Sequence, residues 1–308
     1  PTPPPPHHPH PPTPTPNTTH PQVLCSRTPP HHTLQHPLPH HPDAQTDPPR
    51  RAHTPDNPAD VDQAHCAGLK PRMRLQDVGC GPGITTSTLA KAAQPGGKAV
   101  GIDGSAERIE YAKKKYGSDD VEFEHRDFFS DLSDLGEFDF IWVRFVLEFY
   151  LKEGAQLVKH LAKSLKKGGI LCLADLDHNC MNHYSISERL EKTIQKIVEC
   201  QMKNNNFDPY AGRKLHYFLY DAGMVDIESD MRPHHLIYGE LSDLDRWHWW
   251  QKIELAGKRS GWTFDDYTGG YEEFVEDFKA FFTSPQRFSY TPIIISRGVN
   301  PGAKSDGR

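Results

Sequence analysis

Three glycines follow an acid at close spacing in residues 72–83, which read RMRLQDVGCGPG. The residues before the glycines suit a short buried strand, and residues 84–93 suit a helix. Glycines at such a junction let the backbone turn sharply and approach a ligand, and the helix N-terminus offers N–H groups to it. The spacing is acid-x-G-x-G-x-G, because Ile84 stands where a dinucleotide fingerprint has glycine. The residues expected to contribute to a cofactor site here are Asp77, Gly79, Cys80, Gly81 and Gly83.

Two further acids follow expected strands. A strand over 98–102 ends in Asp103, 20 residues after Gly83. There, beside Gly104, a carboxylate would meet ribose hydroxyls, or it would cap a helix that starts near Ser105. A strand over 121–125 runs into Asp127 and Phe128, which suit an adenine, or else a helix cap and a core phenylalanine.

Strands alternate with helices of about ten to fifteen residues, which predicts a doubly wound, mostly parallel α/β sheet. A fourth strand over 138–143 ends in Arg144, and a fifth spans 170–174. Ligands of such sheets bind at the carboxyl ends of the strands. Asp103, Asp127, Arg144 and Asp175 are all expected at that edge.

As a set, these motifs resemble the class I S-adenosylmethionine-dependent methyltransferases, and the similarity is strongest to the small-molecule, ubiquinone- and menaquinone-biosynthesis branch. The resemblance covers about residues 67–236 and is carried by 77–83, 101–103, 127–128, 138–139, 167–169 and 208–215.

The resemblance implies a Rossmann-like, seven-stranded sheet whose last strand, over 288–296, is antiparallel. It implies S-adenosyl-L-methionine as cofactor, with residues 79–83 at the methionine end, Asp103 at the ribose, Asp127 and Phe128 at the adenine, and Arg144 on the methionine and substrate side. In this family the stretch 208–215 opens the last helix before the sixth strand, and Asp208 suits its cap. Pro292 predicts an edge or a bulge in the last strand.

Two features depart from the family. Gln76 occupies a strand position where the family has leucine, and an unpaired buried amide destabilises a fold by ~1–3 kcal/mol. The family also has helices before the first strand, whereas this chain has a tail rich in Pro and His there.

The implied reaction is methyl transfer to a small-molecule acceptor by in-line displacement. Positioning the acceptor against the methyl group can supply much of the catalysis of such a reaction. A base would assist a phenol, enol or amine acceptor. Glu148 and His178 are the catalytic candidates, and Asp175, Asp177 and His183 are other ionisable groups at the same edge. For each, a structural role is the alternative.

Two segments, 178–208 and 239–284, are expected to cover the substrate. The second contains Trp247, Trp249 and Trp250 and an aromatic series at helical spacing, Tyr271, Phe274, Phe278 and Phe281. These rings either pack on the domain or line the site of an aromatic or apolar acceptor.

Composition divides the chain into three parts. Residues 1–66 contain most of its 28 Pro and are expected to be a disordered tail, because they cannot bury enough apolar surface. An alternative is that this tail is not native coding sequence, since the chain does not begin with Met. The methyltransferase domain is expected over 67–299, and 300–308 as a flexible C-terminus.

Several classes of partner are excluded by composition. The net charge of −6 argues against nucleic acid, and no apolar run reaches the ~20 residues of a membrane helix. Six Cys without a C-x-x-C pair suggest reduced thiols, so we expect a cytoplasmic enzyme with no metal. The alternatives are a non-catalytic cofactor-binding protein on a decayed methyltransferase fold and a nucleotide-dependent oxidoreductase.

Overall fold

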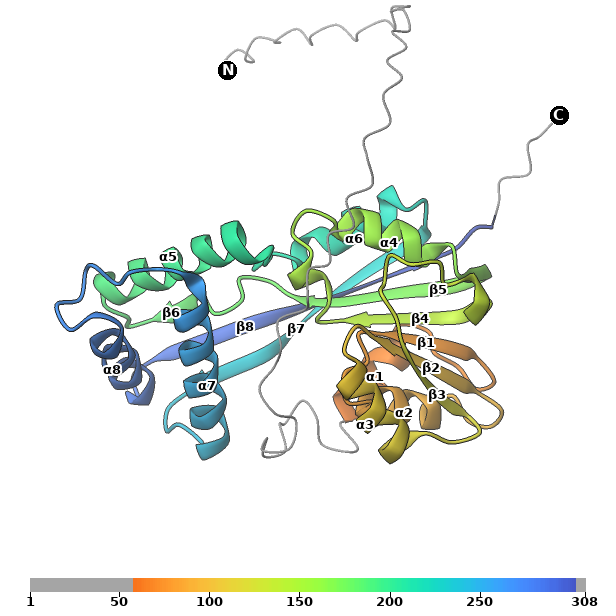
Figure 1. The fold of residues 1–308 in the computed structure, drawn as a ribbon, viewed down its shortest axis with the longest axis horizontal. Coiled ribbons are helices and arrows are strands. Elements are labelled where there is room, and N and C mark those ends of the chain that lie inside the picture. Colours follow the sequence, from red (N-terminus) through yellow and green to blue (C-terminus); the bar gives the residue numbers. More distant parts are fainter. Residues whose placement is uncertain (1–57, 303–308) are drawn as a thin grey trace, which may run out of the picture. The chain divides into compact units, whose positions relative to one another are not determined.

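The computed structural model describes residues 58–302 (Figure 1). The expectations for residues 1–57 and 303–308 lie outside this part of the chain.

Helix α1 (Pro58–Cys66) corrects the predicted start of the folded domain. Residues 58–66 were expected to belong to the disordered tail, yet they form a helix directly before the first strand. The reason is a small apolar face: Ala64 and Ala67 are buried with Leu69 in the same hydrophobic cluster as helix α2 (Ile84–Ala92). The chain therefore does have a helix before its first strand.

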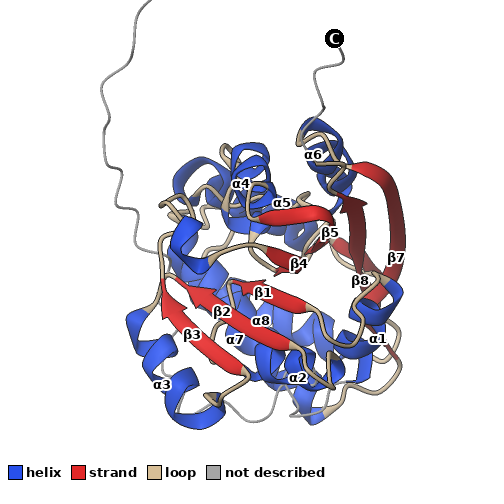
Figure 2. Cartoon of the chain, turned by 90° about the vertical axis from the view of Figure 1, so that its right-hand side faces the viewer, coloured by secondary structure: helices blue, strands red, loops and turns tan. Residues whose placement is uncertain are grey.

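A mostly parallel sheet forms the centre of the domain, as the sequence predicts (Figure 2). Its strand order is β3-β2-β1-β4-β5-β8-β6, and β7 also pairs with β8. The strands are β1 (Arg74–Val78), β2 (Lys98–Asp103), β3 (Val121–His125), β4 (Phe138–Arg144), β5 (Leu165–Leu176), β6 (Asn182–Tyr184), β7 (Val225–Tyr238) and β8 (Phe288–Val299). Strands β1 to β5 are parallel to one another, and β8 is antiparallel to β5, β6 and β7.

The sheet differs from the prediction in two details. It has eight strands, because the short β6 adds to β8. Pro292 lies inside β8, which is an interior strand. The prediction that Pro292 marks an edge strand is therefore wrong, but the alternative prediction of a bulge corresponds to an irregularity in the pairing of β8. The register of β7 against β8 shifts between Pro233 and His235, at the point opposite Pro292.

Helices cover both faces of the parallel strands. Leu89 of α2 and Ile109 of α3 (Ala106–Tyr116) pack with Leu75 and Phe140 on one face. The other face packs Leu157 and Leu215, which belong to α4 (Gly154–Ala162) and α6 (Leu215–Asp221). Two apolar clusters, one on each face, therefore hold the sheet at the centre.

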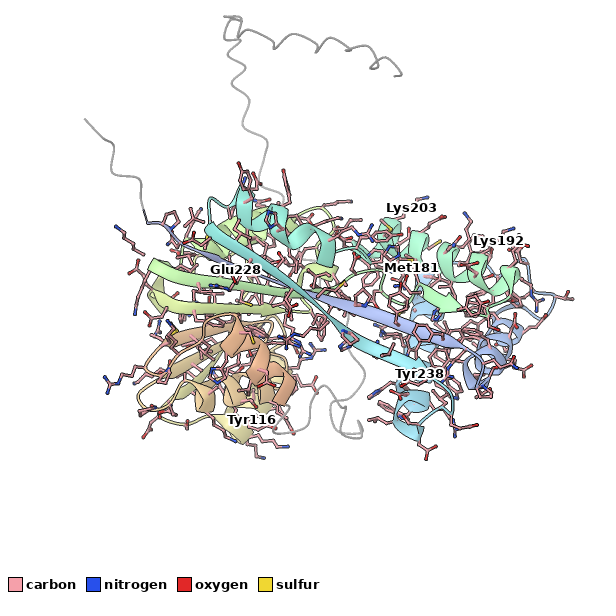
Figure 3. The ribbon with its side chains drawn as sticks, turned by 180° about the vertical axis from the view of Figure 1, so that it is seen from behind. Tyr116, Met181, Lys192, Lys203, Glu228 and Tyr238 are labelled. Carbon is pink, nitrogen blue, oxygen red and sulfur yellow. The ribbon has the colours of Figure 1, made fainter. Side chains whose placement is uncertain are left out.

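A third apolar cluster belongs to the two segments expected to cover the substrate. It is built by α5 (Glu188–Asn205), α7 (Asp243–Ser260) and α8 (Gly270–Thr283), which pack on the far ends of β7 and β8 (Figure 1). In Figure 3, Glu228 marks the part of β7 beside the parallel strands and Tyr238 the part beside α7. We call this unit the helical cover. Phe274, Phe278 and Phe282 of α8 are buried in it, so this aromatic face packs on the fold.

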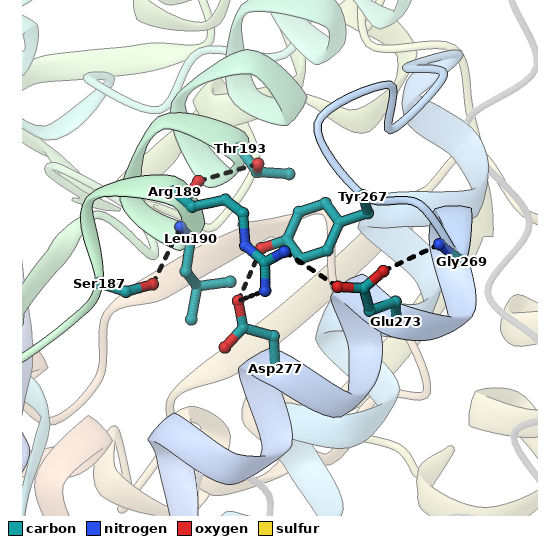
Figure 4. A network of polar contacts seen from close by, with 8 residues as sticks. All are labelled: Ser187, Arg189, Leu190, Thr193, Tyr267, Gly269, Glu273 and Asp277. Atoms are coloured by element: carbon teal, nitrogen blue, oxygen red, sulfur yellow. Dashed lines mark hydrogen bonds and ion pairs between the residues drawn. The ribbon is translucent and has the colours of Figure 1, made fainter.

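Polar contacts tie the helices of the cover together (Figure 4). The Arg189 guanidinium of α5 donates to Glu273 Oε1 at 2.9 Å and to Asp277 Oδ2 at 3.2 Å on α8. The Tyr267 hydroxyl also donates to Asp277 Oδ2, at 2.9 Å. The cover is therefore held by a buried aromatic core and an arginine-centred network at its edge.

Gln76 is fully buried in β1, between Val100 and Ile141, and neither its amide nitrogen nor its amide oxygen has a hydrogen-bond partner among residues 58–302. We expect Gln76→Leu to raise the free energy of unfolding by ~1–3 kcal/mol, because it removes an unpaired polar group from an apolar layer. Urea unfolding measures this. Gln251→Leu, at an exposed position of α7, is the control, and a destabilised Gln76→Leu would contradict the expectation.

Candidate functional site

The loop between β1 and α2 has the strained turn that its glycines predict. Gly79, Gly81 and Gly83 all have positive φ, of 76°, 54° and 87°. A Cβ on Gly83 would lie 2.7 Å from both Ala112 and Phe123, whereas a Cβ on Gly81 would have no atom within 4 Å. The backbone of Gly83 is therefore wedged against the fold, and that of Gly81 faces open space that a ligand can approach.

Asp103 holds this loop from the end of β2. Its side chain is 3% exposed; Oδ2 accepts from the Gly81 N–H at 3.0 Å and Oδ1 from the Ser105 N–H at 2.8 Å. The adjacent Gly104 is exposed, and its carbonyl oxygen lies 3.1 Å from His125 Nε2. Asp103 thus fixes the glycine loop in addition to presenting a carboxylate at the sheet edge.

Asp77 and Cys80 lie behind the loop. Asp77 is buried and accepts from the Thr86 hydroxyl at 2.6 Å, which ties the end of β1 to α2. Burial, aided by the negative charges of Asp77 and Asp103, raises the pKa of the Cys80 thiol well above its usual value. The thiol is therefore protonated at neutral pH.

At the end of β3, the predicted adenine pair separates into two environments. Asp127 is exposed, and its Oδ1 accepts from the Phe129 N–H at 3.0 Å. The Phe128 ring is 3% exposed and packs in the core on the α4 and α6 face. The burial of this ring favours the alternative of a core phenylalanine, and the adenine role of Phe128 stays a prediction.

Tyr150 is an aromatic residue at this edge that the sequence did not single out. Its ring lies 5.7 Å from Phe129 and 6.5 Å from Phe128, measured between ring centres. Burial, together with the negative charges of Asp127 and Asp103, raises the pKa of Tyr150 to about 12. Tyr150 thus lies close to both acids of the predicted nucleoside site.

The segment after β4 connects the glycine loop to the helical cover. Arg144, at the end of β4, stacks its guanidinium 4.3 Å from the centre of the Phe145 ring. Phe145 has a left-handed backbone with φ of 56°, a strained conformation that is enriched at functional sites. Val146 packs so tightly against Gly79 that a Cβ there would clash with it.

Glu148 follows in the 3₁₀ helix Leu147–Phe149, within a cluster of buried carboxyls. It is 9% exposed, and its Oε2 accepts from Asn179 Nδ2 at 2.9 Å. Its N–H donates to Asp175 Oδ2 at 3.1 Å, and its carbonyl accepts from the Asp208 N–H at 2.7 Å. Lys252 of α7 lies at the same cluster, with Nζ 3.4 Å from Asn179 Oδ1.

Burial raises the pKa of Glu148 to about 7. Lys252 and the Asn179 hydrogen bond partly oppose this rise, while Asp208 adds to it. Burial also raises the pKa of Asp175 well above its usual value, with the nearby Glu148 as the second cause. A carboxyl that titrates near neutral pH has the proton affinity that suits a general base.

The other predicted ionisable groups have structural partners. Asp177 is bound by two nitrogens of the Arg213 guanidinium at 2.8 and 2.9 Å. His183 lies 2.8 Å from Ser289 Oγ and 3.0 Å from the Cys180 carbonyl, and burial lowers its pKa to about 4. These contacts favour the structural role for both residues.

His178 is half-buried, with a left-handed backbone and its ring 5.2 Å from that of Tyr210. It lies on the same loop as Asn179, but no contact to Glu148 joins it to the carboxyl cluster.

The stretch 208–215 also differs from expectation. Asp208 does not cap a helix, because its Oδ1 accepts from the Tyr210 N–H and its Oδ2 from Lys214 Nζ; the helical segment begins at Gly212.

These residues fit S-adenosylmethionine by their own geometry. The approachable main chain of Gly81 lies beside the carboxylate of Asp103, and Asp127 is exposed at the next strand end.

Within residues 58–302, no three His, Cys, Asp or Glu side chains are arranged to hold a metal ion, and no helix is both long and apolar enough to cross a membrane.

The family comparison matches the central part of the chain. Residues 76–173 match the family model described as a methyltransferase domain. They contain the glycine loop, Asp103, the β3 end and β4. Residues 76–173 are therefore similar to methyltransferase domains, which agrees with the resemblance.

Two curated proteins are similar to parts of this chain. Demethylmenaquinone methyltransferase from Staphylococcus aureus is 32% identical over 108 residues, covering 34% of this chain. An uncharacterized 37.1 kDa protein in transposon Tn4556 of Streptomyces fradiae is 28% identical over 157 residues, or 51% of this chain. The chain spans 44% of the length of each of these relatives.

A solved structure shows the same fold. A cyclopropane-fatty-acyl-phospholipid synthase-like protein from Lactobacillus casei superposes with a TM-score of 0.53 at 14% identity, covering 78% of this chain and 89% of that chain. The Rossmann-like α/β prediction is thereby confirmed.

Proposed function

We propose that this protein transfers a methyl group from S-adenosylmethionine to a small-molecule acceptor by in-line displacement. The observation that supports this best is Glu148, a buried carboxyl with a pKa near 7 that follows β4 two residues after Val146, the side chain packed on the glycine loop. The segment after β4 thus carries the proposed base and also packs, through Val146, on the glycine loop that follows β1.

In this proposal, the backbone of Gly79, Gly81 and Gly83 holds the methionine end of the cofactor, together with Asp77, Cys80 and Arg144. Asp103 and Gly104 bind the ribose, and Asp127 binds the adenine with the main chain of Phe128. Tyr150 is added as a wall of the adenine site.

The cofactor, when bound, supplies a methyl group on a positively charged sulfur, which is already activated for transfer. The protein then has to exclude water, align the acceptor and accept its proton. We assign the proton to Glu148, with Asn179 holding its Oε2. We further propose that the domain spans 67–299 with α1 added, and that 178–208 and 239–284 cover the acceptor. His178 stays a secondary catalytic candidate.

Calorimetric titration of S-adenosylmethionine and S-adenosylhomocysteine into the full chain tests the proposal. We expect both to bind. A screen of acceptors for S-adenosylhomocysteine release then tests turnover. Failure of both compounds to bind would overturn the proposed function, and binding without turnover on any acceptor would favour the non-catalytic alternative.

Asp103→Asn is expected to weaken S-adenosylmethionine binding by about 10- to 150-fold, because a charge-assisted hydrogen bond of ~1.5–3 kcal/mol is lost. The substitution also places an amide NH2 against one of the two backbone N–H donors, those of Gly81 and Ser105. Calorimetry measures the dissociation constant, and Asp119→Asn, an exposed acid before β3, is the charge-matched control. Unchanged affinity in Asp103→Asn would mean that Asp103 only caps the turn.

A further inference from the structure

Polar side chains from four separate elements meet between the end of β4 and the helical cover. They are Glu148 after β4, Asn179 after β5, His235 on β7 and Lys252 on α7, and we call them the Lys252 cluster. Asn179 connects two of them, since Nδ2 donates to Glu148 Oε2 at 2.9 Å and Oδ1 lies 3.4 Å from Lys252 Nζ. His235 and Lys252 both lie against Trp249. The centre of the His235 ring is 5.6 Å from that of Trp249, and Lys252 Nζ is 5.1 Å from the centre of the Trp249 ring.

Lys252 forms no close ion pair. It is half-buried, and within the described part of the chain no carboxylate lies within 4.0 Å of its Nζ, although its charge acts on the carboxyl of Glu148. Its partners are Asn179, through a long contact of 3.4 Å, and the Cys180 thiol, whereas an ammonium has three N–H donors. By contrast, Lys214 lies 2.6 Å from the buried Asp208. Charges removed from water are normally paired, so an anionic group of a ligand placed at Lys252 Nζ would find a charge that no carboxylate within 4.0 Å already neutralises.

His235 contributes an unpartnered ring nitrogen to the cluster. Its Nδ1 is buried, and no residue in the described part of the chain hydrogen-bonds to it. Burial lowers the pKa of His235, and the positive charge of Lys252 lowers it further, so the ring is neutral at physiological pH. A neutral imidazole can donate a hydrogen bond to an anion or accept one from an acid. Buried polar atoms are rarely left unpaired, which points to a ligand at this nitrogen.

The cluster adjoins the proposed methyl-transfer site along a continuous series of rings. The His235 ring lies 4.2 Å from that of His234, and the His234 ring lies 5.1 Å from that of Phe145. Phe145 precedes Val146, which packs on Gly79 of the glycine loop. A small molecule held at Lys252 therefore borders both the proposed base and the cofactor loop.

We propose that Lys252 and His235 bind an anionic oxygen group of the acceptor, so that the acceptor is an acidic small molecule such as a carboxylate. This inference rests on the proposed function in assigning the anion to the acceptor. Lys252 would neutralise the anion, His235 Nδ1 would hydrogen-bond to it, and the remainder of the molecule would lie toward Glu148.

The test uses the full chain with saturating S-adenosylhomocysteine and benzoate as the probe, followed by ligand-observed NMR. Benzamide is the uncharged match for benzoate. We expect benzoate to bind about tenfold or more tightly than benzamide, and Lys252→Met to abolish this preference. Lys252→Arg, which keeps the charge, should retain it, and this variant covers the case in which Lys252→Met fails to fold.

Lys258→Met is the matched control, because Lys258 is an exposed lysine on the same helix. Equal benzoate binding by wild type and Lys252→Met overturns the inference, and so does the absence of any benzoate preference in wild type up to about 20 mM. Calorimetry of S-adenosylhomocysteine in the same samples separates the two proposals. If that compound fails to bind, the proposed function falls, while the benzoate preference still decides the role of Lys252.

Discussion

Glu148→Gln is expected to lower the rate of methyl transfer by about 10²–10⁴-fold, the usual contribution of a general base. The amide keeps the shape of the side chain and an oxygen that accepts from Asn179 Nδ2, but it cannot accept the acceptor's proton. The wild-type rate should rise with pH through about 7, where Glu148 ionises, and the variant should lose this dependence. Release of S-adenosylhomocysteine, followed across the pH range with any acceptor that wild type methylates, measures both.

The same variant has an expected effect on stability that needs no acceptor. The pKa of Glu148 is 4.5 in the unfolded chain and about 7 in the fold. Between these values the folded state holds a proton that the unfolded state has lost, so the free energy of unfolding falls as pH rises from about 4.5 to 7. The wild type therefore loses on the order of 3 kcal/mol over this window relative to Glu148→Gln.

Urea unfolding at the two ends of this window, compared between the two proteins, measures the contribution of Glu148 together with its effect on Asp175. The groups that face Glu148 are Lys252 and Asn179, which favour its ionised form, and Asp175 and Asp208, which oppose it. Glu191→Gln, at an exposed position of α5, is the control and should follow wild type at every pH. If the difference between Glu148→Gln and wild type does not change with pH, Glu148 does not titrate near 7.

The positions of the parallel strands along the chain were predictable because they depend on local signals. Residues 121–125, for example, form a strand with the predicted ends, and β1 and α2 flank the glycine loop as its sequence requires. Asp103 likewise reaches the loop because the carboxyl ends of parallel strands share one edge. Where a short-range pattern decides the geometry, the sequence was sufficient.

The polar groups of the helical cover could not be predicted in the same way. Lys252 looks like one of several polar residues on α7, and His235 lies in a strand whose pattern gives no hint of burial at Nδ1. Lys252 and His235 come close to Glu148 only because β7 and α7 pack against the end of β4. This packing joins segments that are far apart in the sequence, so a local pattern does not predict it. The outcomes at Phe128 and Asp208 have the same origin. Core packing buries the Phe128 ring, and Lys214 binds the Asp208 carboxylate, and neither contact can be read from the local sequence.

Gly83→Ala is expected to lower the free energy of unfolding by ~2–5 kcal/mol. About 1–2 kcal/mol comes from placing a Cβ at φ of 87°, and ~1–3 kcal/mol from forcing it against Ala112 and Phe123, each 2.7 Å away. Urea unfolding of the full chain measures this loss. A variant as stable as wild type would mean that α3 and β3 can move away from the loop.

Gly81→Ala is the matched comparison, because its φ of 54° carries similar strain while its Cβ would meet no atom within 4 Å. We expect it to lose only ~1–2 kcal/mol of stability. Its larger effect should be on S-adenosylmethionine affinity, measured by calorimetry, because the new methyl group occupies the space through which a ligand approaches the main chain. The two glycines thus separate the two demands on this loop: Gly83 is required for packing the fold, and Gly81 for access to the cofactor. Normal cofactor affinity in Gly81→Ala would show that the cofactor does not approach the loop at this residue.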